Sequence, residues 1–182
     1  MHKLLVFFLF TATLWAQDGA SRVNDVLVKL KTPKQGSKLE IFVLEETDLN
    51  EFAEAAIQSK KRLGVQKVEL NLQGAGRFQG TALINMDDVE LTGFTARAFK
   101  SLLSGTQTLI AVGKITTTKG QGTCALESAR VNDIPIPAWL ANSVIGYLSS
   151  RQPPHVDVSE PFELPYQVQE VSVTQDRIVL IR

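Results

Sequence analysis

The sequence predicts an α+β fold in which a long curved antiparallel β-sheet wraps around one or two amphipathic helices. Three observations lead to this prediction. Residues 47–64 place apolar side chains at the i, i+3, i+4, i+7 spacing of a single helical face. Several long stretches alternate apolar and polar residues with the period of two that is typical of strands. Tight turns rich in Gly, Asn or Asp join these stretches in pairs, which implies antiparallel hairpins.

The composition is that of one folded domain. The chain has 182 residues, of which 44% are apolar, and this is enough for a packed core. The formal net charge is zero and the basic residues are scattered, which argues against a nucleic-acid interface. No stretch beyond the first residues is long and apolar enough to be a membrane span. We therefore expect residues 17–182 to form a single domain.

Residues 1–16 have the parts of a secretory signal peptide. A positive charge at Lys3 precedes the apolar run 4–10, and smaller residues lead to Ala16. We expect cleavage after Ala16 and export to the periplasm or the extracellular space, although Leu14 stands where a small residue is usual. The alternative is an uncleaved anchor, but the run is short for a span of about 20 residues. No cysteine near this segment could accept a lipid.

Two strands are predicted before the central helix. Residues 23–31 carry alternating apolar side chains, and a turn-forming segment separates them from residues 38–44. The second of these strands has apolar residues on both faces. In the helix that follows, Thr47 is the expected N-cap and Gly64 the expected C-terminal stop.

Two hairpins are predicted after this helix. Residues 65–72 and 77–86 alternate on either side of a Gly-Ala-Gly turn, and residues 106–118 and 123–131 flank a Lys-Gly-Gln-Gly turn. A short helix is expected between the hairpins, over residues 95–103.

The last third of the chain contains a second predicted helix and a final hairpin. Pro137 suits the first turn of a helix over residues 138–149, which carries no charge and is therefore either enclosed or in contact with something apolar outside this chain. Residues 151–165 contain four prolines and are expected to be irregular. Residues 168–173 and 178–181 then form a hairpin that should tie the C-terminus into the sheet.

Few residues could carry catalysis. His155 is the only histidine after the signal segment, and with Asp157 it offers two metal ligands, which are too few for a closed zinc site. No Gly-x-Ser-x-Gly elbow presents a serine. The glycines at positions 74, 76 and 80 connect two predicted strands, whereas a phosphate-binding loop opens a helix, so we interpret them as turn glycines.

The remaining reactive side chains have structural interpretations. Cys124 is the only cysteine, so it forms no internal disulfide, and its strand-like setting indicates a buried thiol rather than a nucleophile. Asp87 and Asp88 are interpreted as a bulge or a solvated turn rather than an acid–base pair. The sequence thus predicts a protein that is not an enzyme, with no cofactor and no metal site.

Three motifs resemble landmarks of small bacterial periplasmic proteins of the tubular lipid-binding (TULIP) type. Residues 46–52, Glu-Thr-Asp-Leu-Asn-Glu-Phe, resemble the start of the first helix in these proteins. Residues 131–137, Val-Asn-Asp-Ile-Pro-Ile-Pro, and the closing hairpin after Leu164-Pro165 are similar to two further landmarks. The resemblance implies a curved antiparallel sheet around a helix, an apolar groove for acyl chains and no catalytic residues. The chain lacks the lipid-anchor cysteine of many exported relatives.

We therefore expect an exported, non-catalytic binding protein for a lipid or another long apolar ligand, held in a groove between sheet and helices. The expected groove residues are apolar: Phe52, Ala56, Ile57, Phe78, Trp139, Leu140, Val144, Ile145 and Leu148. The alternative is that these residues fill a core without a void. The protein would then be a structural or protein-interaction module of the cell envelope, with helix 138–149 docking a partner.

Overall fold

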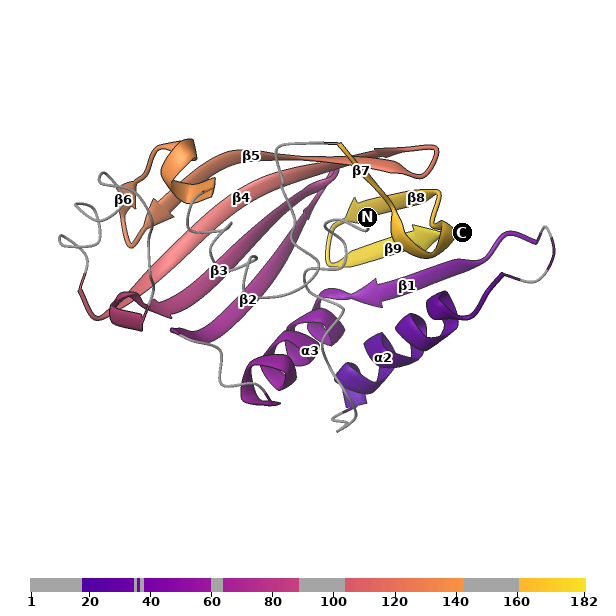
Figure 1. Cartoon of the computed structure of the whole chain (residues 1–182), viewed down its shortest axis with the longest axis horizontal. Helices are drawn as coiled ribbons and strands as arrows, with labels where there is room; N and C mark the ends of the chain where they lie inside the picture. Colours follow the sequence, from indigo (N-terminus) through magenta and orange to yellow (C-terminus); the bar gives the residue numbers. More distant parts are fainter. Residues whose placement is uncertain (1–17, 35, 37, 60–63, 89–103, 143–160) are drawn as a thin grey trace.

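The structure, a computed structural model, describes residues 18–34, 36, 38–59, 64–88, 104–142 and 161–182 (Figure 1). In chain order its elements are α2 (Asp18–Lys31), β1 (Ile41–Glu45), α3 (Glu46–Ser59), β2 (Val65–Gly74), β3 (Arg77–Asn85), the 3₁₀ turn η1 (Met86–Asp88), β4 (Thr106–Thr118), β5 (Gln121–Val131), β6 (Ile134–Pro135), β7 (Phe162–Glu163), the 3₁₀ turn η2 (Pro165–Gln167), β8 (Glu170–Thr174) and β9 (Arg177–Ile181). Within these ranges no helix has the length and apolar character of a membrane span.

The strands form two antiparallel sheets. The larger has the order β2-β3-β4-β5-β6, with β7 also paired to β5, and the smaller has the order β1-β9-β8. The predicted α+β class with mostly antiparallel pairing is confirmed. The C-terminal hairpin β8–β9 is also confirmed; it forms the smaller sheet with β1, and a single bridge between Gln73 and Gln175 links its turn to the larger sheet. Figure 1 shows the smaller sheet beside one end of the larger one, with α2 and α3 lying together below β1 and β2.

Both central hairpins are present as predicted. The β2–β3 turn contains Ala75 and Gly76, both with positive φ, and the β4–β5 turn contains Lys119 and Gly120, also with positive φ. Strand β4 covers the predicted residues 106–118, and the turn η1 takes the place of the bulge expected at its aspartates. The period-two pattern was therefore a sufficient guide to these strands.

The prediction of a strand over residues 23–31 is wrong, because these residues belong to helix α2. The helix buries Val23, Leu27 and Leu30, which are spaced at intervals of three and four, and it leaves Val28 62% exposed. β-Branched valines favour strands locally, but the stripe that they form with leucine is also a helical face. Packing of that stripe against α3 and the smaller sheet decides the outcome.

Helix α3 is confirmed, with Glu46 and Asp48 in its first turn, where negative charge is favourable. The helix begins at Glu46, so Thr47 lies inside it and is not the N-cap that the sequence predicted. Its N-terminal half closes the edge of β2. The Asn50 side chain accepts a hydrogen bond from the Leu70 N–H at 2.7 Å and donates one to the Leu70 carbonyl at 2.9 Å. The Leu72 N–H donates to the Glu46 carboxylate at 2.5 Å.

The predicted helix 138–149 is seen in part, because residues 138–142 are helical and the rest lies outside the described residues. The predicted helix 95–103 also lies outside them. The proline-rich segment is not wholly irregular, since β7 pairs with the start of β5. There Phe162 lies over Gly122, where a Cβ would be only 2.7 Å from its Cζ. Burial of this ring explains why a short strand forms among the prolines.

Candidate functional site

One face of the six-stranded sheet is apolar, and we call it the inner face. The strand register places Leu70, Gly80, Ala111 and Ala129 in one row across it, and Val68, Ala82, Leu109 and Val131 in the next. The opposite face carries exposed polar side chains such as Lys67, Glu69, Lys114 and Arg130. The inner face is therefore where an apolar ligand could bind.

Two buried clusters cover the ends of the inner face. The first cluster joins both sheets and both helices, and its largest fully buried members are Phe52, Leu44, Leu72, Leu180, Val23 and Val168. The second cluster lies at the other end of β3 to β5 and consists of Ile84, Met86, Leu109, Ala129, Val131, Ile136, Leu140 and Ala141. Both consist of well-buried side chains, which is the behaviour of a packed core.

Between the two clusters the inner face is only partly covered. We call this region the open strip and define it by Val68, Gly80, Ala82, Ala111 and Leu126, which are all of intermediate burial. Ala82 and Leu126 form its border, because they also pack against the second cluster. At its centre, a Cβ placed on Gly80 would meet no heavy atom of the described residues within 4 Å apart from its chain neighbours. A glycine inside a strand weakens the strand and often marks the close approach of a ligand or another backbone.

Gly80 lies in the middle of β3, inside the strand predicted over residues 77–86, and is paired with Leu70 on one side and Ala111 on the other. The open strip was not predicted, because it depends on this pairing between strands. The available signal was the small residues at alternate positions, Gly80 and Ala82 in β3 and Ala111 and Gly113 in β4. They indicate a shared surface only once the register of the two strands is known.

The predicted groove residues are divided between the two clusters. Phe52 belongs to the first cluster and Phe78 packs against it, whereas Leu140 belongs to the second. Ala56 is buried, Ile57 is partly buried and Trp139 is 51% exposed. Val144, Ile145 and Leu148 lie outside the described residues. The residues that can be placed therefore do not line one common surface, and most of them are core residues.

Cys124 lies on the inner face and packs against the first cluster. Burial raises the pKa of its thiol from 9.0 to about 11, so the neutral form is favoured. The expected buried thiol agrees with this environment, although the residue is only partly buried. His155 and Asp157 lie outside the described residues, and the described part of the chain contains no group of three or more metal-ligating side chains.

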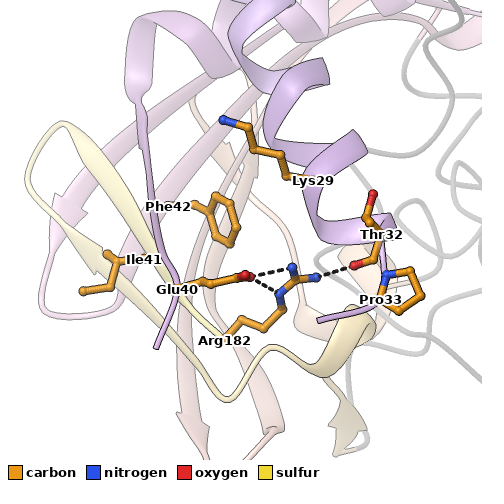
Figure 2. Close-up of a pocket in the computed structure, with 7 residues that line it drawn as sticks. All are labelled: Lys29, Thr32, Pro33, Glu40, Ile41, Phe42 and Arg182. Carbon is orange, nitrogen blue, oxygen red and sulfur yellow. Dashed lines mark hydrogen bonds and ion pairs between the residues drawn. The ribbon is translucent and has the colours of Figure 1, made fainter. Parts of the chain in front are cut away.

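A second, polar feature is a pocket of about 530 Å³ where the end of α2 meets β1 and β9 (Figure 2). Seven residues line it: Lys29, Thr32, Pro33, Glu40, Ile41, Phe42 and Arg182. Arg182 is almost completely buried and lies 5.8 Å from the centre of the Phe42 ring. Its Nε and Nη2 atoms lie 2.7 and 2.5 Å from Oε2 of Glu40.

The remaining contacts of Arg182 are to the end of helix α2. Its Nη1 donates to the carbonyls of Leu30 and Thr32 at 2.8 and 3.0 Å. These carbonyls lie at the negative end of the helix dipole, where a cation is favourable. Because Arg182 is already bonded to these groups and to Glu40, the pocket has a structural explanation, and the open strip remains the stronger candidate site.

The comparisons with known proteins do not identify a relative. No family model, no curated protein and no solved structure matches this chain.

Proposed function

We propose that this protein is a non-catalytic carrier or sensor that binds a lipid acyl chain, or another long apolar molecule, against the open strip. The observation that carries the proposal is that no heavy atom of the described residues lies within 4 Å of a Cβ placed on Gly80, between two filled hydrophobic clusters. Ligand sites of this class are concave and largely apolar. The five residues of the open strip carry no charge and only small or aliphatic side chains, which suits a hydrocarbon chain.

In this proposal the six-stranded sheet curves around its helices, as the resemblance to TULIP-type proteins implies, and the small residues form the floor of a groove. The segment 1–16 would direct the protein out of the cytoplasm, where it would meet envelope or extracellular lipids. The fit of the open strip to a chain of methylene groups supports this. Burying apolar surface stabilises a complex by about 25 cal/mol per Å², so no charged anchor is required.

The second candidate function is an envelope protein-interaction module. Two exposed apolar side chains at the β6 end of the molecule favour it, since Ile134 is 59% and Trp139 is 51% exposed. Tryptophan is enriched at the centres of protein interfaces. Under this alternative, Trp139→Ala would abolish capture of a partner, while the substitution of Gly80 described below would have no effect on function.

The experiment that tests lipid binding fills the open strip. Gly80→Leu starts a large side chain at a point where a Cβ meets no heavy atom of the described residues within 4 Å, so we expect the fold to be retained. Binding of a fluorescent fatty acid, measured by titration, should fall at least tenfold. The matched control is Thr81→Leu, which adds the same side chain to the neighbouring residue on the opposite face of β3 and should leave binding unchanged.

Native mass spectrometry of protein purified from its own host provides an independent measurement. We expect co-purified lipid on the wild type and its absence from Gly80→Leu. Wild-type protein that carries no lipid and takes up no fluorescent fatty acid would overturn the proposal. Equal uptake by both variants would show that the site lies elsewhere.

A further inference from the structure

Strand β1 lies at an edge of the smaller sheet. Glu40, just before β1, exchanges two backbone hydrogen bonds of 2.9 Å with Arg182. In an antiparallel pair such residues alternate, so the backbone groups of Phe42 and Leu44 also point toward β9. The N–H and C=O groups of Ile41 and Val43 therefore point away from β9. Neither residue receives a hydrogen bond there from any residue that the structure describes. Such an edge can pair with another chain.

The side chains of β1 are also unusual for an exposed edge. Leu39, Ile41 and Val43 are 68%, 58% and 42% exposed, and they share the outer face of the smaller sheet with Val179 and Ile181. We call these five residues the β1 patch. Native proteins normally protect an edge strand with charge, proline or a bulge, and the one such feature in β1 is the charge of Glu45 at its last position. An uncovered apolar edge of this kind indicates a binding surface.

The opposite edge of the same sheet is closed. The hydroxyl of Thr117 in β4 accepts a hydrogen bond from the Val171 N–H at 3.0 Å and donates to the Val171 carbonyl at 3.1 Å. The Gly76 N–H donates to the Val173 carbonyl at 3.0 Å. A second copy of the chain therefore cannot extend this sheet at β8, and pairing through β1 gives a closed dimer and not a fibre.

We propose that two copies of this chain associate through their β1 strands, antiparallel about a two-fold axis, so that the two smaller sheets become one continuous sheet. The charges at the two ends of β1 are complementary in this arrangement. Lys38 precedes the strand and Glu45 is its last residue, so antiparallel pairing brings the basic end of one copy near the acidic end of the other.

The apolar side chains favour one register. With Phe42 opposite Phe42 of the second copy, Ile41 lies opposite Val43, so the exposed apolar side chains of the two copies become neighbours on the outer face. Centring the pair on Glu40 would instead place two Glu40 residues directly opposite each other, and like charges in that position destabilise a pair of strands.

Sedimentation equilibrium of the purified full chain tests this proposal. We expect the wild type to form a dimer whose dissociation constant rises at least tenfold in the Ile41→Lys, Val43→Lys double variant, with an unchanged circular dichroism spectrum. The matched control is Ile134→Lys, because Ile134 is 59% exposed and lies outside the β1 patch. This control should dimerise like the wild type. A wild type that stays monomeric up to tens of micromolar would overturn the proposal.

A charge substitution provides a second test that does not touch the apolar residues. Lys38→Glu should weaken the dimer, because it replaces a basic residue with an acidic one near Glu45 of the second copy. The weakening should shrink as ionic strength rises, since exposed charges are screened. An equal loss of dimer in Ile134→Lys, or no change in both β1 variants, would rule out association through β1.

Discussion

Phe78 lies across Gly113 on the neighbouring strand, and a Cβ placed on Gly113 would be 2.9 Å from its Cζ. The ring packs against the first cluster, so it marks the point where the filled core ends and the open strip begins. A strand glycine that is covered by an aromatic ring weakens its sheet little, because the ring supplies the contacts that a side chain would make. Gly80, on the same strand as Phe78, has no such cover.

The two glycines should therefore respond differently to alanine. Gly113→Ala forces the Phe78 ring to move, and we expect it to destabilise the fold by about 1–3 kcal/mol, the usual cost of overpacking. Gly80→Ala meets open space and should be neutral or stabilising by up to about 1 kcal/mol, because it restricts the unfolded chain. Urea denaturation of both variants measures the difference. A stability loss at position 80 equal to that at 113 would show that the strip is filled.

Removing the buried guanidinium of Arg182 should also lower the free energy of unfolding. Arg182→Met leaves the Glu40 carboxylate and the carbonyls of Leu30 and Thr32 without their donor, so we expect a loss of about 1–3 kcal/mol, the usual cost of a buried polar group left without its partner. Arg177→Met is the matched control. Arg177 is half exposed and lies 3.8 Å from Glu45, so its loss should cost less than about 1 kcal/mol. Thermal and urea unfolding check both values.

The sequence predicted most strands because their pattern is local. Residues 106–118 are rich in Thr, Ile and Val, and the predicted bounds coincide with those of β4; the final hairpin was recognised from its valines and turn. The strand predicted over residues 23–31 is wrong because Val23, Leu27 and Leu30 fit a helical face as well as a strand. Only the partner surface, which is distant in sequence, decides between the two.

The candidate site was harder to predict than the fold. Phe52, Phe78 and Leu140 are apolar and were predicted to line a groove, but apolar residues are also what a core requires, and the structure assigns these three to the two clusters. The open strip depends on Gly80 and Ala111 lying side by side. Their sequence separation hides this pairing until the register of β3 and β4 is known. The hydrogen bond between Arg182 and Glu40 also joins residues that are distant in sequence, so the sequence pattern does not reveal it.

The link between α3 and the larger sheet gives a third prediction. Asn50→Ala removes both the donor and the acceptor that satisfy the Leu70 backbone, so we expect destabilisation by about 1–3 kcal/mol. Asn50→Asp keeps the acceptor for the Leu70 N–H and loses only the donor, so its effect should be smaller. Hydrogen exchange at Leu70 should accelerate in Asn50→Ala and stay slow in Asn50→Asp. Similar exchange in the two variants would contradict the assigned role.

Cys124 gives a prediction that depends on pH. Alkylating reagents react with the thiolate, and burial raises the pKa of this thiol to about 11 from 9.0. At pH 8 the folded protein should therefore react with iodoacetamide about a hundredfold more slowly than the urea-unfolded chain, since two pKa units separate the two states. The rate in the folded protein should climb between pH 9 and 11. Mass spectrometry of quenched samples measures both rates, and Cys124→Ala is the blank.

The raised pKa of the Cys124 thiol also makes the stability of the fold depend on pH. The folded state holds the thiol proton more tightly than the unfolded state, so between about pH 9 and pH 11 the folded protein binds more protons. This contribution to stability is fully present below pH 9 and is lost as the pH rises through about 11. The alkaline fall in the urea midpoint should therefore be shallower in Cys124→Ala than in the wild type. Parallel pH profiles for the two proteins would mean that Cys124 titrates alike in both states, which would contradict its burial against the first cluster.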